Sequence, residues 1–268
     1  MSRMRAPAVA GQFYPDDPIK LRLAINEYIS QAKQRDKADP TDSRPKAIIG
    51  PHAGYIYSGP IAGSGYAHLA NLKSQPSRVV LVGPSHWARV AGLATSSARA
   101  FVTPLGNVPV DVKAIEKILE LPQVVVQDDA HIREHCLEVH LPFLQTSFGD
   151  FELVPLVVGN ASASEVAEVL RSLWGGPETI VVISSDLSHY HTYDTAVMLD
   201  KITSQAIEEL RLLKEGQACG LKAINGLLFF AKQVALRAET VDLRNSGDTA
   251  GPKDRVVGYG AYVFRERI

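Results

Sequence analysis

Three short runs of apolar residues each end in a turn that carries polar side chains, and this repeated pattern constrains the fold most. The runs cover residues 47–49, 79–82 and 180–183, and the turns after them contain His52, His86, and the pair Asp186 and His189. Buried parallel strands typically appear as short continuous apolar runs, and open α/β sheets bind ligands outside the carboxyl ends of their strands. We therefore expect three parallel neighbouring strands that bring these side chains to one rim.

Helical patterns separate the predicted strands along most of the chain. Residues 61–72 connect the first two strands as a βαβ unit, whose crossover should be right-handed. The polar stretch 33–45 is short and leads directly into the first strand, so we interpret it as a surface loop and not as a domain boundary. The alternation predicts an α/β fold, with residues 1–268 forming a single three-layer domain whose central, largely parallel or mixed β-sheet is flanked by helices.

Composition and missing motifs exclude several classes of protein. A formal net charge of −1 provides no electrostatic footprint for nucleic acid or an anionic membrane. No apolar run approaches the ~20 residues of a membrane helix, and the N-terminus lacks the apolar segment of a secretory signal. The two cysteines, Cys136 and Cys219, are too few for a disulfide framework. The chain also lacks a Gly-x-Ser-x-Gly elbow, a Walker loop and a dinucleotide fingerprint. We expect a soluble cytoplasmic protein that binds neither nucleic acid nor membrane.

The histidines at the strand ends are the strongest candidates for metal ligands. His52 and His86 occupy matching positions, and neutral imidazole suits iron, copper and zinc. A hydrogen-bonded core histidine is the alternative for each of them. Asp186 and His189 face one way if their segment forms a turn of helix. One of them could then be a metal ligand and the other an acid or base. Alternatively, Asp186 only orients a histidine. His131 lacks this context, and we interpret it as an ordinary surface or helix residue.

A second polar cluster lies within residues 134–148, where leucines keep a helical spacing. It contains Glu134, His135, Glu138 and His140. A solvent-exposed or capping helix face is one interpretation of this cluster. The interleaved leucine and valine residues favour burial instead, and a buried glutamate requires a partner. We include His140 among the candidate catalytic residues.

Four segments resemble the signature sequences of the Memo family, whose prokaryotic members are called AmmeMemoRadiSam system protein B. These segments are residues 51–59 (PHAGYIYSG), 83–86 (GPSH), 134–143 (EHCLEVHLPF) and 184–190 (SSDLSHY). Residues 5–15 and 257–259 match as well, so the resemblance covers nearly the whole chain. The family name also implies a functional link to a radical-SAM protein.

The Memo family is similar in fold to the class III extradiol ring-cleavage dioxygenases. In those non-haem Fe(II) enzymes, two histidines and a carboxylate hold the iron, and a further histidine is the acid–base catalyst. The resemblance implies that His52 and His86 are metal ligands and that His189 is the acid–base group, with Asp186 beside it. The third ligand is a C-terminal glutamate in the dioxygenases and a cysteine in some Memo proteins. Here the corresponding region offers only Asp248 as a carboxylate, and we assign it as the third ligand.

Functions of different classes are compatible with these residues. One is an Fe(II)-dependent oxidoreductase that acts on a small, catechol-like or unknown substrate with O₂, while His189 moves protons. Another is a non-catalytic protein that uses the same cleft to bind a peptide, a small ligand or a partner protein. Zinc-dependent hydrolysis, with Asp186 or His189 as the remaining ligand, is a third alternative.

Overall fold

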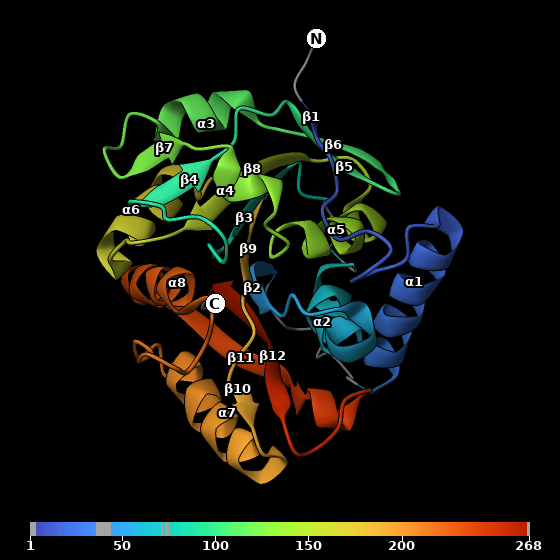
Figure 1. Ribbon diagram of the computed structural model, residues 1–268. Coiled ribbons are helices and arrows are strands. Elements are labelled where there is room, and N and C mark those ends of the chain that lie inside the picture. Colours follow the sequence, from blue (N-terminus) through green and yellow to red (C-terminus); the bar gives the residue numbers. More distant parts are fainter. Residues whose placement is uncertain (1–3, 36–43, 71, 73–74, 267–268) are drawn as a thin grey trace.

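A mixed β-sheet runs through the centre of the computed structural model, which describes residues 4–35, 44–70, 72 and 75–266 (Figure 1). Most of the predicted loop 33–45 lies outside the described residues. In the described part the sheet has nine strands in the order β10-β12-β2-β9-β3-β8-β4-β7, with β11 also paired to β12. The strands are β2 (Pro45–Gly50), β3 (Arg78–Pro84), β4 (Leu93–Thr95), β7 (Val124–Val126), β8 (Glu152–Val158), β9 (Thr179–Ser184), β10 (His189–His191), β11 (Leu236–Asn245) and β12 (Val256–Glu266).

Four parallel strands form the middle of this sheet, and they include the three strands that the sequence predicts. β9 lies between β2 and β3, and β8 pairs with the other side of β3. Val182 aligns with both Ile48 of β2 and Leu81 of β3. Every residue of β2 and β9 is buried, because helices cover both faces of the sheet, and this explains the apolar runs 47–49 and 180–183 inside them. The expected parallel arrangement is confirmed.

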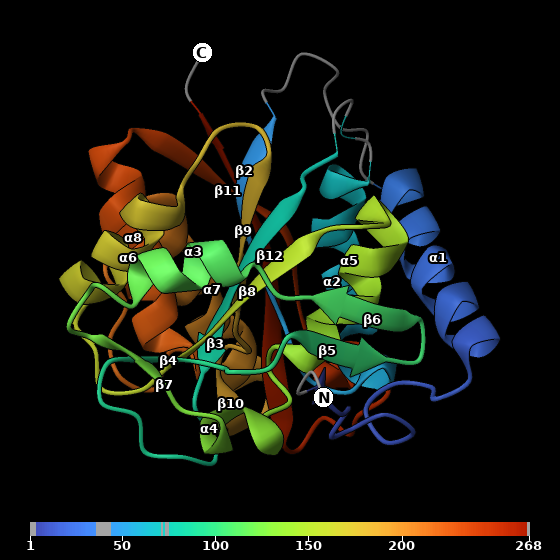
Figure 2. The ribbon, with the colours of Figure 1, turned by 90° about the horizontal axis from the view of Figure 1, so that it is seen from above.

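Helices form a layer on each side of the sheet, as Figure 2 shows. One layer contains α1 (Pro18–Arg35), α2 (Tyr55–Leu69) and α5 (Leu141–Phe148). The other contains α3 (Val112–Ile118), α6 (Ala163–Leu173), α7 (Tyr193–Glu208) and α8 (Leu221–Gln233). Three shorter helices, α4 (Asp129–Ile132), η1 (Glu138–His140) and η2 (Ser246–Asp248), lie in connecting segments. The predicted three-layer α/β fold is therefore confirmed, and none of the described helices has the length and apolar character needed to cross a membrane.

Helix α2 begins at Tyr55, earlier than the sequence pattern predicts, and it includes Pro60. Glycines on this helix allow α1 to approach closely. A Cβ atom on Gly59 would lie 2.5 Å from the ring of Tyr28 in α1, and one on Gly63 would lie 2.8 Å from the Tyr28 backbone. The helix is therefore set by tight packing against α1 and not by its local propensity, which glycine and proline lower.

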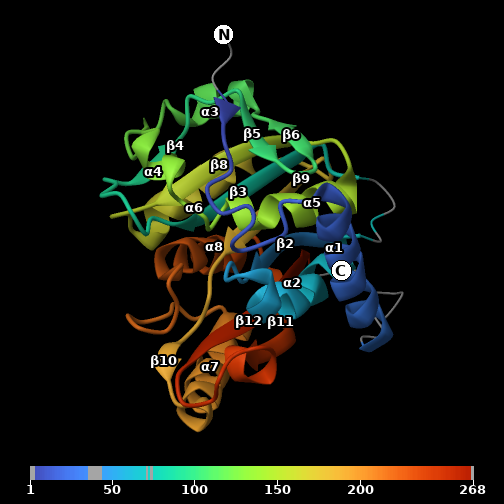
Figure 3. The same cartoon turned by 45° about the vertical axis from the view of Figure 1, so that its right-hand side comes forward.

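The N-terminal segment crosses the molecule from a small second sheet to α1, as Figure 3 shows. Sequence reasoning did not predict this sheet, which consists of β1 (Met4–Arg5), β5 (Ala100–Thr103) and β6 (Gly106–Pro109). Glu138 holds the segment in place, because its buried carboxylate pairs with the guanidinium of Arg5 and accepts hydrogen bonds from the Ala8 N–H (2.7 Å), the Val9 N–H (3.0 Å) and the Tyr14 hydroxyl (2.5 Å). The buried glutamate thus has the partner that its burial requires.

Candidate functional site

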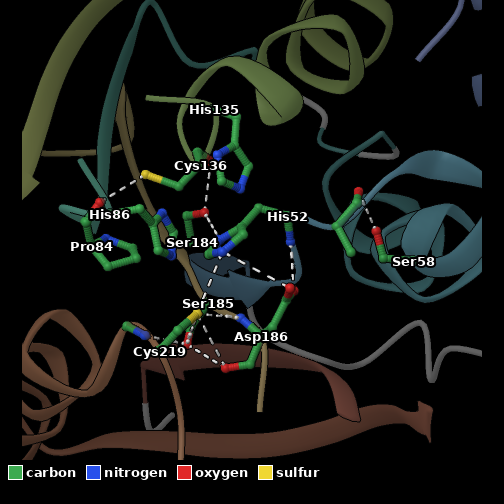
Figure 4. Close-up of polar contacts among 12 residues, drawn as sticks. His52, Ser58, Pro84, His86, His135, Cys136, Ser184, Ser185, Asp186 and Cys219 are labelled. Carbon is green, nitrogen blue, oxygen red and sulfur yellow. Dashed lines mark hydrogen bonds and ion pairs between the residues drawn. The ribbon is translucent and has the colours of Figure 1, made fainter. Parts of the chain in front are cut away.

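Three strand ends converge at one edge of the central sheet. His52 follows the end of β2 by two residues, His86 follows the end of β3 by two, and Asp186 follows the end of β9 by two. Because β9 lies between the other two strands, the side chains meet in front of it (Figure 4). The ring centroids of His52 and His86 are 5.2 Å apart. The structure therefore brings these predicted site residues together, at the crevice where open α/β sheets bind ligands.

Cys219 adds a third donor atom to this pair of histidines. It immediately precedes the first turn of α8, and its Sγ atom lies 3.4 Å from Nε2 of His52. His52, His86 and Cys219 each offer one ligand atom, and these three atoms all lie within 4.8 Å of one another. The sequence named Cys219 only as one of two cysteines, since no motif around it indicates metal binding. Its role depends on α8 returning to the sheet edge, which sequence spacing does not reveal.

Asp248, which we expected as the third ligand, lies elsewhere. Its carboxylate accepts hydrogen bonds from the hydroxyl of Tyr193 (2.6 Å) and from the backbone N–H of Asn245 (2.9 Å). The second of these bonds belongs to the cap of the short helix η2. Asp248 does not line the cavity that the described residues form around the histidines. The structure thus gives Asp248 a local structural role and places a thiol beside the two imidazoles.

Hydrogen bonds fix the tautomer of His52. Its Nδ1 atom lies 2.7 Å from Oγ of Ser184, and the same hydroxyl donates its proton to the carbonyl of Cys136 (2.7 Å). A serine hydroxyl has one proton, so Ser184 must accept from Nδ1–H. Burial, followed by neighbouring histidines, lowers the pKa of His52 well below 6.5 and keeps the ring neutral. The lone pair of Nε2 therefore points toward Cys219 and is available to a metal ion.

A buried carboxylate orients His86 in the same way. Nδ1 of His86 donates to Oε1 of Glu134 (2.9 Å), and the His86 backbone N–H donates to Oε2 (2.7 Å). Burial opposes ionisation of Glu134, but the hydrogen bonds from His86 outweigh it and lower the pKa of this carboxyl to about 2. Burial alone would lower the pKa of His86, but the hydrogen bond to Glu134 and the charges of Glu134 and Asp186 together outweigh it, and the pKa is raised. With Nδ1 occupied, Nε2 is the atom that His86 offers to a ligand.

His135 completes a group of three imidazole rings. Its ring stacks on His86 at 4.9 Å, with an interplanar angle of 17°, and lies 5.4 Å from the ring of His52. Phe13 of the N-terminal segment packs against it at 4.9 Å. Burial lowers the pKa of His135, although the Glu134 carboxylate opposes this shift. The candidate site therefore combines three imidazole rings with one aromatic wall supplied by the N-terminal segment, and burial favours the neutral form of His52 and His135.

The thiol of Cys219 is protonated in the absence of metal. Burial and the nearby carboxylate of Asp186 raise its pKa to about 12. The backbone N–H of Asp186 donates to Sγ at 3.2 Å, and this hydrogen bond is one that a thiolate accepts better than a thiol. A metal ion bound to Cys219 would replace the thiol proton, because the thiolate is the ligand form of cysteine.

Asp186 and His189 lie at the same cavity without sharing a helix face. The turn of helix that would have made them face one way does not form, since the chain continues from β9 through an irregular segment into β10. Asp186 accepts a hydrogen bond from the His52 backbone N–H (2.8 Å), and burial raises its pKa to about 6 although that bond opposes the shift. His189 donates Nδ1–H to the carbonyl of Leu187 (2.8 Å), which leaves its Nε2 as a proton acceptor.

These residues line a cavity of about 720 Å³. Four aromatic side chains contribute to its wall, namely Phe13, Tyr57, Tyr190 and Tyr259. Arg255 is the only lysine or arginine in the described lining. The volume is that of a site for a small organic molecule, and the mixture of aromatic walls with a few polar groups is typical of such sites.

Two other histidines belong to the core and not to this cavity. His140, a candidate catalytic residue from the sequence, is buried with Nδ1 2.8 Å from the Tyr66 hydroxyl, and burial lowers its pKa to about 3. His131, which we expected at the surface or on a helix, is buried on α4, and its Nε2 lies 3.1 Å from the carbonyl of Ala94. Burial lowers the pKa of His131 to about 4. Both residues are therefore hydrogen-bonded core histidines.

Comparison with known proteins assigns the family. The family model for Memo-like proteins matches residues 5–263. Proteins described as MEMO1 family proteins from Ignicoccus hospitalis and Archaeoglobus fulgidus are 37% and 36% identical to this chain, over 97% and 98% of its length and 98% and 100% of theirs. An uncharacterized protein from Escherichia coli K12 has a similar fold, with a TM-score of 0.50, 14% identity, and coverage of 81% of this chain and 99% of that one. The chain belongs to the family of Memo-like proteins.

Proposed function

We propose that His52, His86 and Cys219 bind one iron(II) ion, and that the protein is an oxidoreductase acting on a small, catechol-like molecule in the adjoining cavity. The observation that carries this proposal is the convergence of three donor atoms that all lie within 4.8 Å of one another. Supporting hydrogen bonds occupy Nδ1 of both histidines, so each Nε2 is left for a ligand. Core histidines without a ligand do not require this arrangement.

The donor set fits a divalent transition metal. Two donors bonded to one ion at about 2.0–2.3 Å lie about 3.3–3.8 Å apart in a tetrahedral site, and Nε2 of His52 is 3.4 Å from Sγ of Cys219. Imidazole suits iron, copper and zinc, and thiolate is also a ligand for these metals. When bound, iron(II) supplies open coordination positions at which a chelating substrate and O₂ react.

The remaining polar residues of the cavity are suited to proton transfer. His189 presents Nε2 to the cavity with its Nδ1–H bonded to Leu187, so it accepts the proton of a substrate hydroxyl and returns it later. Asp186 lies next to His52 and holds the backbone of this ligand in place. The aromatic rings of the wall exclude water and orient a planar substrate.

Zinc-dependent hydrolysis is the second candidate function. The thiol in place of a carboxylate favours it, because cysteine and histidine together are common zinc ligands. Three protein ligands leave one position for the water that such a reaction uses. His189 would then receive the proton of that water.

Anaerobic calorimetric titration with iron(II) and with zinc(II) tests these proposals. We expect one ion per chain in the wild type. His52→Ala, His86→Ala and Cys219→Ser should each weaken metal binding by more than the about 10–100-fold that loss of a residue supporting a ligand costs. Asp248→Asn is the matched control and keeps wild-type affinity. Unchanged binding in Cys219→Ser contradicts the proposed ligand set, and no binding of either metal to the wild type favours a non-catalytic binding protein.

The reaction is then tested on the loaded protein. Oxygen consumption with catechol, dependent on iron(II) and abolished in His189→Gln, supports the oxidoreductase. Because His189 is not a proposed ligand, this variant should still bind iron(II), which separates loss of chemistry from loss of metal. Metal binding without oxygen consumption, together with zinc-dependent ester hydrolysis, supports the second candidate.

A further inference from the structure

We propose that the ligand of this cavity is a planar carboxylate whose anionic group binds Arg255, a specificity-determining residue at the rim. This inference rests on the proposed function for the other end of the ligand, which chelates the metal held by His52, His86 and Cys219. It specifies the charge of the ligand and its orientation in the cavity, which the metal site alone does not determine.

Among the described residues, Arg255 is a cation of the cavity that has no carboxylate as an ion-pair partner. It is exposed and lines the cavity immediately before β12, and no carboxylate of the described residues lies within ion-pair distance of its side chain. Its contact is with Tyr190, because the guanidinium carbon lies 4.4 Å from the centroid of that ring. A guanidinium stacked on an aromatic ring keeps its N–H groups free at the edge of the plane, where they bind a carboxylate in a bidentate manner.

The backbone of β10 presents Tyr190 to this cation. The pairing of β10 with β12 is irregular between His189 and His191, which places Tyr190 in a bulge. Its φ of 64° is in the left-handed region, which is costly for a tyrosine, and its side chain is 62% exposed. Bulges and left-handed residues near sites commonly redirect a side chain. Here the result is an exposed ring that supports Arg255 beside His189, whose ring centroid lies 5.6 Å from that of Tyr190.

The neighbouring loop anchors this rim. The Lys253 carbonyl accepts the Tyr193 N–H at the start of α7 (3.0 Å), and the Lys253 ammonium lies 4.5 Å from the Tyr193 ring. The backbone N–H of Gly251 donates to the carbonyl of Ser246 (2.7 Å). Arg255 therefore projects from a backbone that these contacts hold on one side and strand β12 holds on the other.

The positions of the charged and aromatic groups in the cavity indicate the chemistry of the ligand. Acidic and imidazole groups lie at the strand ends, Arg255 lies at the β12 side, and aromatic rings line the wall. A flat molecule fits between the rings, with chelating oxygens toward His52 and a negative group toward Arg255. One bidentate guanidinium balances the single charge of a carboxylate, whereas a phosphate dianion leaves charge without a partner in the described lining.

Calorimetric titration with two probes tests the proposal. Catechol and 3,4-dihydroxybenzoate share the chelating oxygens and differ in the carboxylate, and both are titrated anaerobically into iron(II)-loaded protein. We expect the wild type to bind the carboxylate about 10–100-fold more tightly than catechol, the range of a charge-assisted hydrogen bond. Arg255→Gln should lose this preference and keep its affinity for catechol. Arg89→Gln, which removes an exposed arginine from a different cavity, is the control and should keep the preference.

The outcomes separate this inference from the proposed function. Equal affinities of the two probes in the wild type, or a preference that persists in Arg255→Gln, overturn the role of Arg255 even if iron(II) binds. If the wild type does not bind iron(II), the proposed function fails, and the same titrations on metal-free protein still decide the carboxylate contact, which involves no metal ligand. A preference for the carboxylate in metal-free wild type that Arg255→Gln abolishes supports the inference alone.

Discussion

His140 provides a sharp test of the structural assignment, because the sequence made it a candidate catalytic residue and the structure buries it in the core. Burial lowers its pKa from 6.5 to about 3, so the folded protein holds the ring neutral. The unfolded chain takes up a proton on this histidine once the pH falls below about 6.5. The stability that the neutral ring provides is therefore complete above about pH 6.5 and is lost progressively as the pH falls toward about 3.

The size of the effect follows from this shift. Each pKa unit corresponds to about 1.4 kcal/mol, so the full shift corresponds to about 4–5 kcal/mol, and about 2 kcal/mol of it is lost between about pH 7.5 and pH 5. Glutamine at position 140 does not titrate. We therefore expect the free energy of unfolding of the wild type, relative to that of His140→Gln, to fall by about 2 kcal/mol over this interval.

Urea unfolding of metal-free protein at both pH values measures the difference. Tyr66→Phe is the matched control, because it removes the hydroxyl that contacts His140 and leaves the titrating ring in place. The loss in free energy of unfolding caused by Tyr66→Phe should be similar at both pH values. If the difference in free energy of unfolding between wild type and His140→Gln does not change with pH, His140 is not a buried neutral histidine. Loss of metal binding in His140→Gln would show that the residue belongs to the site after all.

Three further substitutions test the contacts around the site. Ser184→Ala removes the acceptor that fixes the tautomer of His52, so metal affinity measured by calorimetry should fall about 10–100-fold with little change in melting temperature. Glu138→Gln removes the partner of a buried guanidinium and should lower the free energy of urea unfolding by about 3–5 kcal/mol, so an unchanged value would count against this ion pair. Gly258→Ala would place a Cβ atom 1.9 Å from Oδ2 of Asp200, and a thermal melt should show a clear loss of stability, whereas wild-type melting would mean that this contact relaxes freely.

The centre of the fold could be predicted from the sequence because its strands are buried on both faces. Each of the three predicted strands contains a continuous apolar run and is followed by a turn with a polar side chain. The edges were harder to predict. The hairpin of β5 and β6 and the short strand β10 have mixed sequences whose pairing depends on partners far away in the chain, and α2 includes glycines that only its contact with α1 explains.

The candidate site was predicted as far as its residues lie at strand ends. Local spacing determines that His52, His86 and Asp186 leave the sheet at the same edge, since parallel strands place their carboxyl ends together. Strand-end spacing does not predict the position of Cys219, which lies just before a helix. It also does not exclude Asp248, whose carboxylate caps a short helix. Both outcomes depend on where segments far apart in the sequence fold back.

The amino-acid sequence by itself thus determined the family, the α/β architecture and the two histidines of the site, because periodicity and strand-end turns are local properties. Only the tertiary structure decided that a thiol lies beside the two imidazoles, that hydrogen bonds occupy Nδ1 of each histidine, and that Arg255 lies at the rim. Donor sets, tautomers and burial depend on distances between segments that are remote in the chain. Those distances exist only after the layers have packed.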